Sequence, residues 1–129
     1  MALRIALDSN RCSDFFRPTS DAVLVVQTSD EVWLPFVVLG ELRAGFLRGD
    51  KPRQNERDLI DFLMSPRVSV LLADESTTHV YAELHADCRR RGTPIPTNDL
   101  WIAALVRQHG LALYSRDAHF EKIPGLLRV

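Results

Sequence analysis

The sequence predicts a single α/β domain built on a central parallel sheet of four to five short strands flanked by helices. Short apolar segments with strand character alternate along the chain with longer segments of helical spacing, which is the order of βαβ units. The seven prolines fall mostly at the boundaries between these segments. A length of 129 residues fits one domain of ordinary size, so residues 1–129 are expected to fold as one unit.

Alternating and helical patterns divide the first half of the chain. Leu3, Ile5 and Leu7 alternate with small or polar residues and then stop at an acidic residue, which indicates a short strand. Gly49 and Pro66 mark where two of the helices should end. The expected elements are a strand at 3–7, helices at 9–17 and 20–28 divided at Pro18, a strand at 32–35, and helices at 36–48 and 53–64.

The second half of the chain continues the alternation. Asp74 or Ser76 can cap a long helix, and Gly92 supplies its C-terminal stop. Thr97 or Asn98 can cap the helix that follows. The expected elements are a strand at 68–72, a helix that runs to residue 91, a stiff connector at 93–96, a helix at 99–109, a strand at 111–114 and a short fifth strand at 126–128.

Charge, cysteine usage and hydropathy exclude several classes of protein. Sixteen basic and seventeen acidic residues give a net charge of −1, which excludes a uniformly basic protein that coats nucleic acid but allows a local basic groove. Cys12 and Cys88 match neither a metal-ligand spacing nor a disulfide framework. The longest apolar run, 32–40, contains Pro35 and is too short to span a bilayer. Since Asp8 also interrupts any signal-peptide core, we expect a cytoplasmic protein with no membrane segment.

Four acidic residues that are far apart in the sequence should meet at one edge of the predicted sheet. In a parallel sheet, the C-terminal ends of the strands and the N-terminal ends of the helices that follow them share one edge. Asp8 ends the first strand, and Asp117 comes shortly after the fourth. Glu41 and Asp99 lie early in the helices that begin near the same edge. These four residues are the candidate catalytic and metal-binding site.

Two of the four acids have apolar surroundings that call for a cation. Glu41 shares a helix face with small and apolar residues, and Asp99 heads the apolar run 100–106. Two carboxylates about 5 Å apart repel each other by roughly 3 kcal/mol at an effective dielectric near 20. Ligand sets made only of oxygen suit Mg²⁺ or Mn²⁺. Taken singly, Asp99 could equally serve the helix dipole, and Asp8 could be only the polar end of a strand.

Four short motifs carry a resemblance to a known family. They are LDSN at 7–10, GEL at 40–42, NDLWIAAL at 98–105 and SRDAHF at 115–120. In this order and spacing they resemble the PIN-domain family and, more narrowly, VapC-type ribonuclease toxins of type II toxin–antitoxin pairs. The resemblance implies that Asp8, Glu41, Asp99 and Asp117 bind the metal ion. Asn10 and Ser115 match polar positions beside that site, and Ser115 stands where the family more often has Thr.

The same resemblance implies an activity and partners. The expected activity is an endonuclease that cleaves single-stranded RNA with a water activated by Mg²⁺ or Mn²⁺, leaving a 5′-phosphate and a 3′-hydroxyl. The expected partners are the RNA substrate, an antitoxin whose C-terminal segment covers the acidic site, and a second copy of the chain in a homodimer. RNA also needs positive charge beside the acids. Arg11, Arg43 and Arg116 are the candidates for it, and His119 follows Asp117 closely enough to touch substrate.

Two other functions fit part of the pattern. A receiver-like signalling module also gathers acids at the carboxyl edge of a parallel sheet, and Asp74 could imitate its phosphoacceptor. No lysine closes the last expected strand, however, so that chemistry has little support. A PIN-like scaffold that binds a partner without cleaving RNA is the other alternative. It predicts weak metal binding and no loss of function when Asp99 is replaced by Asn.

Overall fold

The computed structural model describes residues 2–17 and 21–129. Four strands form one sheet in the order β3-β2-β1-β4, and every neighbouring pair is parallel. The predicted fold class is therefore confirmed. The strands are β1 (Arg4–Leu7), β2 (Glu31–Pro35), β3 (Val68–Leu71) and β4 (Ala112–Tyr114). The first strand is central, since Ile5 of β1 pairs with Val32 on one side and with Ala112 on the other.

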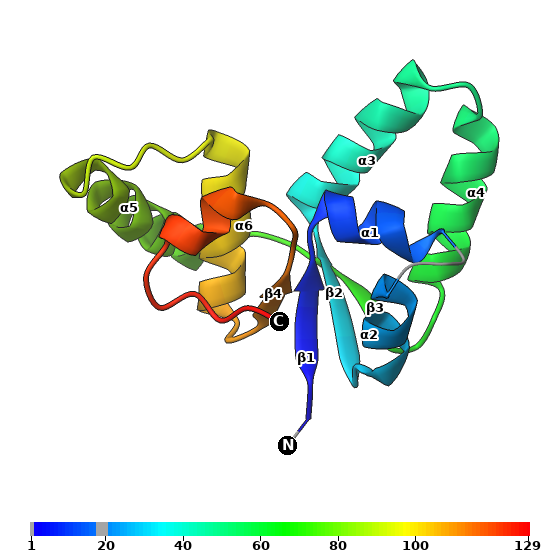
Figure 1. Ribbon diagram of the computed structural model, residues 1–129, viewed down its shortest axis with the longest axis horizontal. Helices are drawn as coiled ribbons and strands as arrows, with labels where there is room; N and C mark the ends of the chain where they lie inside the picture. The colour runs from blue at the N-terminus through cyan, green and yellow to red at the C-terminus, as the bar shows by residue number, and fades with distance from the viewer. Residues whose placement is uncertain (1, 18–20) are drawn as a thin grey trace.

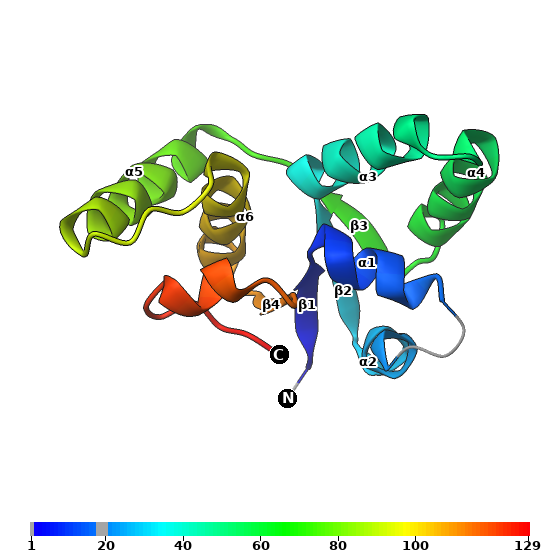
Figure 2. The same ribbon diagram turned by 45° about the horizontal axis from the view of Figure 1, so that its top comes forward.

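Helices cover both faces of this sheet (Figures 1 and 2). The chain moves outward from β1 to β3 and then crosses back to β4 on the opposite side of β1. Because such crossovers are right-handed, the reversal of direction puts the two groups of helices on opposite faces. One group is α1 (Ser9–Phe15), α2 (Ala22–Thr28), α3 (Phe36–Arg48) and α4 (Pro52–Leu63). The other is α5 (Glu75–Arg90), α6 (Thr97–Gln108) and the short 3₁₀ helix η1 (Ala118–Lys122).

The core is densest around β1 and α6. Ile5, Ala6 and Leu7 have no exposed surface, as expected for a central strand covered on both faces. The α6 run 100–106 is buried apart from Trp101, whose ring is partly exposed and stacks on Tyr81 of α5 at 3.8 Å. Packing on both sides therefore fixes α6, which carries one of the candidate acids.

Several expected boundaries differ from the structure. The segment at 126–128 forms only a single bridge, from Leu113 to Arg128, so the described sheet has four strands and not five. Neither Thr97 nor Asn98 caps α6, because the helix begins at Thr97 and its N-cap is Pro96, whose side chain offers no acceptor. Asp74 does cap α5 through a capping box with Thr77.

Other expectations at the ends of elements have mixed outcomes. The first helix ends at Phe15, and the second begins at Ala22. The break predicted at Pro18 lies outside the described residues. Gly92 ends the α5 region with a φ of 67°, a left-handed conformation that favours glycine. Among the residues described, no helix combines the length and the apolar character that a membrane span requires.

Candidate functional site

The site lies where the chain reverses its direction across the sheet. The connections leave β1 toward β2 on one side, while the last crossover returns to β4 on the other side. Ligands of open parallel sheets bind at such switch points, beyond the carboxyl ends of the strands. Asp8 follows β1 directly, and its backbone N–H donates to the Tyr114 carbonyl at the end of β4, at 3.1 Å. The first and last strands thus bring their C-terminal residues together.

Asp8 is held in place by several hydrogen bonds. It is the N-cap of α1 and accepts a hydrogen bond from the Ser9 N–H at 2.8 Å. Its other carboxylate oxygen accepts from the Ser115 hydroxyl at 2.6 Å and from the Asn10 amide at 3.4 Å. Burial is the main cause that raises the pKa of Asp8, and the bonds from Ser115 and Ser9 oppose it. Asn10 and Ser115 therefore do lie beside the first acid, as the resemblance implied.

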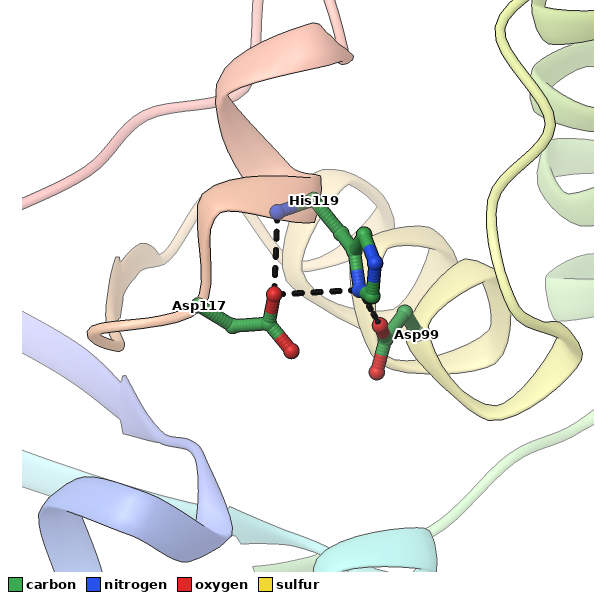
Figure 3. Close-up of side chains that lie close together, drawn as sticks. All are labelled: Asp99, Asp117 and His119. Carbon is green, nitrogen blue, oxygen red and sulfur yellow. Dashed lines mark hydrogen bonds and ion pairs between the residues drawn. The ribbon is translucent and has the colours of Figure 1, made fainter.

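A second group joins the start of α6 to the loop after β4 (Figure 3). Asp117 is the N-cap of η1 and accepts from the His119 backbone N–H at 2.9 Å. The ring nitrogen Nδ1 of His119 lies 2.8 Å from Asp99 Oδ2 and 3.0 Å from Asp117 Oδ1. One ligand atom from each of these three side chains lies within 4.8 Å of the others, a spacing that a single metal ion could bridge.

Glu41 completes the acidic group from the opposite face of the sheet. Its Oε1 is buried and has no hydrogen-bond partner in the described part of the chain. Burial is the largest cause that raises the pKa of Glu41, followed by the negative charges of Asp8 and Asp99. The pKa of Asp99 is raised as well, first by burial and then by Asp117 and Asp8, against a hydrogen bond from His119. The four predicted acids therefore share one electrostatic environment, which we call the acidic rim: Asp8, Glu41, Asp99 and Asp117.

The predicted RNA-binding arginines are engaged in ion pairs within the protein. Arg116 binds Asp14 with two nitrogens, at 2.7 and 3.0 Å. Arg11 lies 3.4 Å from the same carboxylate and over the Tyr114 ring, 4.5 Å from its centre. Arg43 binds Glu56 of α4 with two nitrogens, at 3.0 and 2.9 Å. Their role in binding RNA stays a prediction that these pairs weigh against. Of the four predicted RNA contacts, His119 is the one that enters the acidic rim.

Sequence reasoning missed the part that Asp14 plays. The sequence suggested a cap or a solvated acid, but Asp14 is 8% exposed and holds two arginines. The hydrogen bond from Arg116 is the main cause that lowers its pKa. The i,i+3 spacing of Arg11 and Asp14 was the available signal, whereas the 102 residues between Asp14 and Arg116 hid the stronger contact.

Two grooves lead away from Glu41. The groove among α1, α3 and α4 has a volume of about 640 Å³ and includes Ser9 and Asn10 at the end near the rim. The groove between α3 and the start of α6 has a volume of about 570 Å³. Glu41 and Arg48 line both of them. A polymeric substrate could therefore leave the rim on either side of α3.

Comparison with known proteins places this geometry in a family. The model of the PIN domain matches residues 5–126. The chain belongs to the PIN-domain family. Ribonuclease VapC4 of Mycobacterium tuberculosis is 34% identical over 90 residues, which cover 70% of this chain and 69% of that protein. Plasmid stability protein StbB of Pseudomonas syringae pv. tomato is 32% identical over an alignment of 133 positions, covering 95% of this chain and 94% of that protein.

Solved structures of PIN-domain toxins show the same fold. The crystal structure of VapBC2 from Rickettsia felis, bound to a DNA fragment from its promoter, contains a chain that superposes with a TM-score of 0.83 at 25% identity. The superposition covers 98% of each chain. A chain of DNA-bound VapBC from Salmonella typhimurium gives a TM-score of 0.85 at 24% identity. The parallel sheet and its flanking helices are thus those of a PIN domain over nearly the entire chain.

Proposed function

We propose that this PIN domain is a metal-dependent endoribonuclease of the VapC type, the toxin of a toxin–antitoxin pair. The observation that carries the proposal is the buried, unpartnered Oε1 of Glu41 facing three further carboxylates. A buried carboxylate without a partner is costly, and a cation relieves that cost. The relatives named as VapC ribonucleases and the structures of VapBC complexes support the same activity.

The residues of the acidic rim suit a hard divalent cation. Asp8, Glu41, Asp99 and Asp117 would hold it with carboxylate oxygens, the ligands that Mg²⁺ and Mn²⁺ prefer. His119 adds a nitrogen within reach of the same cluster. When bound, the ion would supply a Lewis acid and a water of lowered pKa beside an RNA phosphodiester. The expected products carry a 5′-phosphate and a 3′-hydroxyl.

The neighbouring side chains keep the acids in position. Ser115 donates to Asp8 and accepts the Asp117 N–H at 3.0 Å, so one hydroxyl links two acids of the rim. Asn10 accepts the Arg116 N–H at 3.1 Å, which ties the loop after β4 to α1. His119 bridges Asp99 and Asp117. These contacts hold the carboxylates in a fixed geometry before substrate arrives, which is what efficient catalysis requires.

The proposed partners follow from the same family. An antitoxin would bind the toxin and cover the acidic rim, and two copies of the chain would form a homodimer in the cytoplasm. The solved relatives include VapBC2 from Rickettsia felis and FitAcB from Neisseria gonorrhoeae. The receiver-like alternative has no support in the family match, so the scaffold that binds without cleaving is the remaining competitor.

The test is cleavage of an end-labelled panel of single-stranded RNAs with Mg²⁺, Mn²⁺ or EDTA. We expect cutting that requires metal, leaves 5′-phosphates and disappears in the Asp99→Asn variant. Asp74→Asn is the matched control, because Asp74 caps α5 outside the rim and Asn also caps helices. Cutting that survives EDTA would point to histidine chemistry at His119. Absence of cutting, together with no stabilisation by metal, would favour the binding scaffold.

A further inference from the structure

We propose that the groove among α1, α3 and α4 binds the RNA strand on one side of the scissile phosphate. In this proposal Arg17 and Arg48 contact phosphates and Phe16 stacks on a base. The inference rests on the proposed ribonuclease function and names the surface that would receive its substrate. It departs from the sequence-based expectation, which assigned RNA binding to Arg11, Arg43 and Arg116.

The groove begins at the acidic rim. Ser9, Asn10 and Glu41 line one end, and Phe16, Arg17 and Arg48 lie along it. Its volume of about 640 Å³ falls within the range of roughly 300–1,000 Å³ that is usual for ligand pockets. The three helices that form it lie on one side of the sheet (Figures 1 and 2). A strand held by its phosphate at the rim would therefore continue directly into this groove.

The distribution of ion pairs selects Arg17 and Arg48. RNA binding requires cations that can pair with phosphates. The three arginines predicted for this role already pair with Asp14 or Glu56. Neither Arg17 nor Arg48 has an ion pair in the parts of the chain that the structure describes, and both line the groove.

The walls of the groove favour an extended polymer. The guanidinium of Arg48 lies along α3, since a Cβ at Gly45 would meet its Nη2 at 3.9 Å. Asp58 is the acid on the α4 wall, and it accepts a hydrogen bond from Gln54 at 2.8 Å. The opposite groove shares Arg48 but does not include Arg17, so Arg17 distinguishes the two paths.

Phe16 offers a surface on which a base can stack. Its ring is 38% exposed, although it packs edge-on against Phe15 and Phe62 at 5.4 and 5.7 Å. These two neighbours restrict the ring while leaving part of it open to solvent. Aromatic rings fixed beside a basic groove are the usual stacking platforms for single-stranded nucleic acid.

The experiment measures binding of a fluorescein-labelled single-stranded RNA of roughly 12 nucleotides by anisotropy over a range of NaCl concentrations. All proteins carry Asp99→Asn, so that the RNA stays intact. We expect Arg17→Ala with Arg48→Ala to weaken binding about tenfold or more and to lower the slope of log K against log[NaCl] by about 1.4, or roughly 0.7 for each phosphate contact. Arg89→Ala with Arg91→Ala, on the opposite side of the sheet, should change the affinity by less than about twofold.

Phe16 is tested by a second pair of variants. Phe16→Ala should weaken binding by about fivefold or more, whereas Phe16→Tyr keeps the ring and should restore the affinity. A thermal melt of each variant identifies any that fails to fold. If Phe16→Ala does not fold, the arginine variants decide the matter alone.

The outcomes separate this proposal from the proposed function. If the protein without substitutions cleaves RNA but the arginine pair binds it with unchanged affinity and salt slope, the groove is not the RNA path. That result would leave it as a surface for a protein segment and would leave the ribonuclease assignment intact. If the unsubstituted protein cleaves no RNA with Mg²⁺ or Mn²⁺, the proposed function itself fails, whatever the groove binds.

Discussion

Replacement of Glu41 by Gln tests whether the acidic rim is built for a cation. Without metal, the Glu41 charge lies beside Asp8 and Asp99, and both raise its pKa. Gln keeps nearly the same shape, removes the charge and adds an amide that can donate to the neighbouring carboxylates. We therefore expect Glu41→Gln to stabilise the metal-free protein, the reverse of what most substitutions at partly buried positions do.

The magnitude follows from the charges that surround Glu41. Each repulsion amounts to about 2–3 kcal/mol for charges some 5–8 Å apart at an effective dielectric near 20. Partial exposure of Glu41 and screening by salt reduce the total, so we expect a net gain of about 1–2 kcal/mol. For a chain of 129 residues this corresponds to a rise in Tm of about 3–8 °C. Differential scanning fluorimetry at pH 8 in EDTA measures it.

Addition of Mg²⁺ or Mn²⁺ should reverse the comparison. The unsubstituted protein should gain stability from the metal, and Glu41→Gln should gain less because it has lost a ligand. Glu56→Gln is the matched control, since Glu56 pairs with Arg43 on the protein surface and its loss should lower stability by at most about 1 kcal/mol with or without metal. A lower Tm for Glu41→Gln in EDTA would refute the reasoning, because it would mean that the Glu41 carboxylate has a stabilising partner.

Three further predictions concern pH, an ion pair and a glycine. Because the folded protein raises the pKa of Glu41, its charge penalty is fully present above that pKa and is lost below the unfolded value; the Tm advantage of Glu41→Gln in EDTA should therefore shrink as the pH falls from 8 toward about 4. Asp14→Asn should destabilise the protein by about 1–3 kcal/mol in urea denaturation, because Arg116 and Arg11 lose their shared carboxylate. Gly40→Ala should add about 1 kcal/mol by the same assay, since a Cβ there meets nothing within 4 Å and the residue lies inside α3; a loss of stability would show that the helix does not accept it.

The acids of the rim could be predicted from sequence because topology alone delivers them. Once strands and helices alternate, the end of β1 and the start of α6 must lie at the same edge of the sheet, whatever the details of packing. The position of Asp8 and Asp99 follows from that rule. The expected helix at 36–48 also matches α3, because apolar spacing and a following glycine bound it at both ends.

The partners of the arginines could not be predicted in the same way. Arg116 and Asp14 are 102 residues apart, and Arg43 reaches Glu56 across the turn between two helices. Such pairs depend on how the faces of neighbouring helices are rotated toward each other, which local spacing does not determine. The fifth strand failed for a related reason, since 126–128 has strand-like residues but only Arg128 finds a bridge partner.

The pairing of the first strand with the last has a consequence for synthesis of the protein on the ribosome. β1 supplies Asp8 early, whereas β4 and the residue Asp117 emerge near the end of translation. Until β4 docks against β1, a growing chain holds Asp8 and Glu41 but lacks the second half of the rim. A domain that folds as a unit would therefore leave the nascent polypeptide inert toward the very messenger that encodes it. Order of emergence would act as a safeguard, and it would hold until the newly made enzyme leaves its translating ribosome.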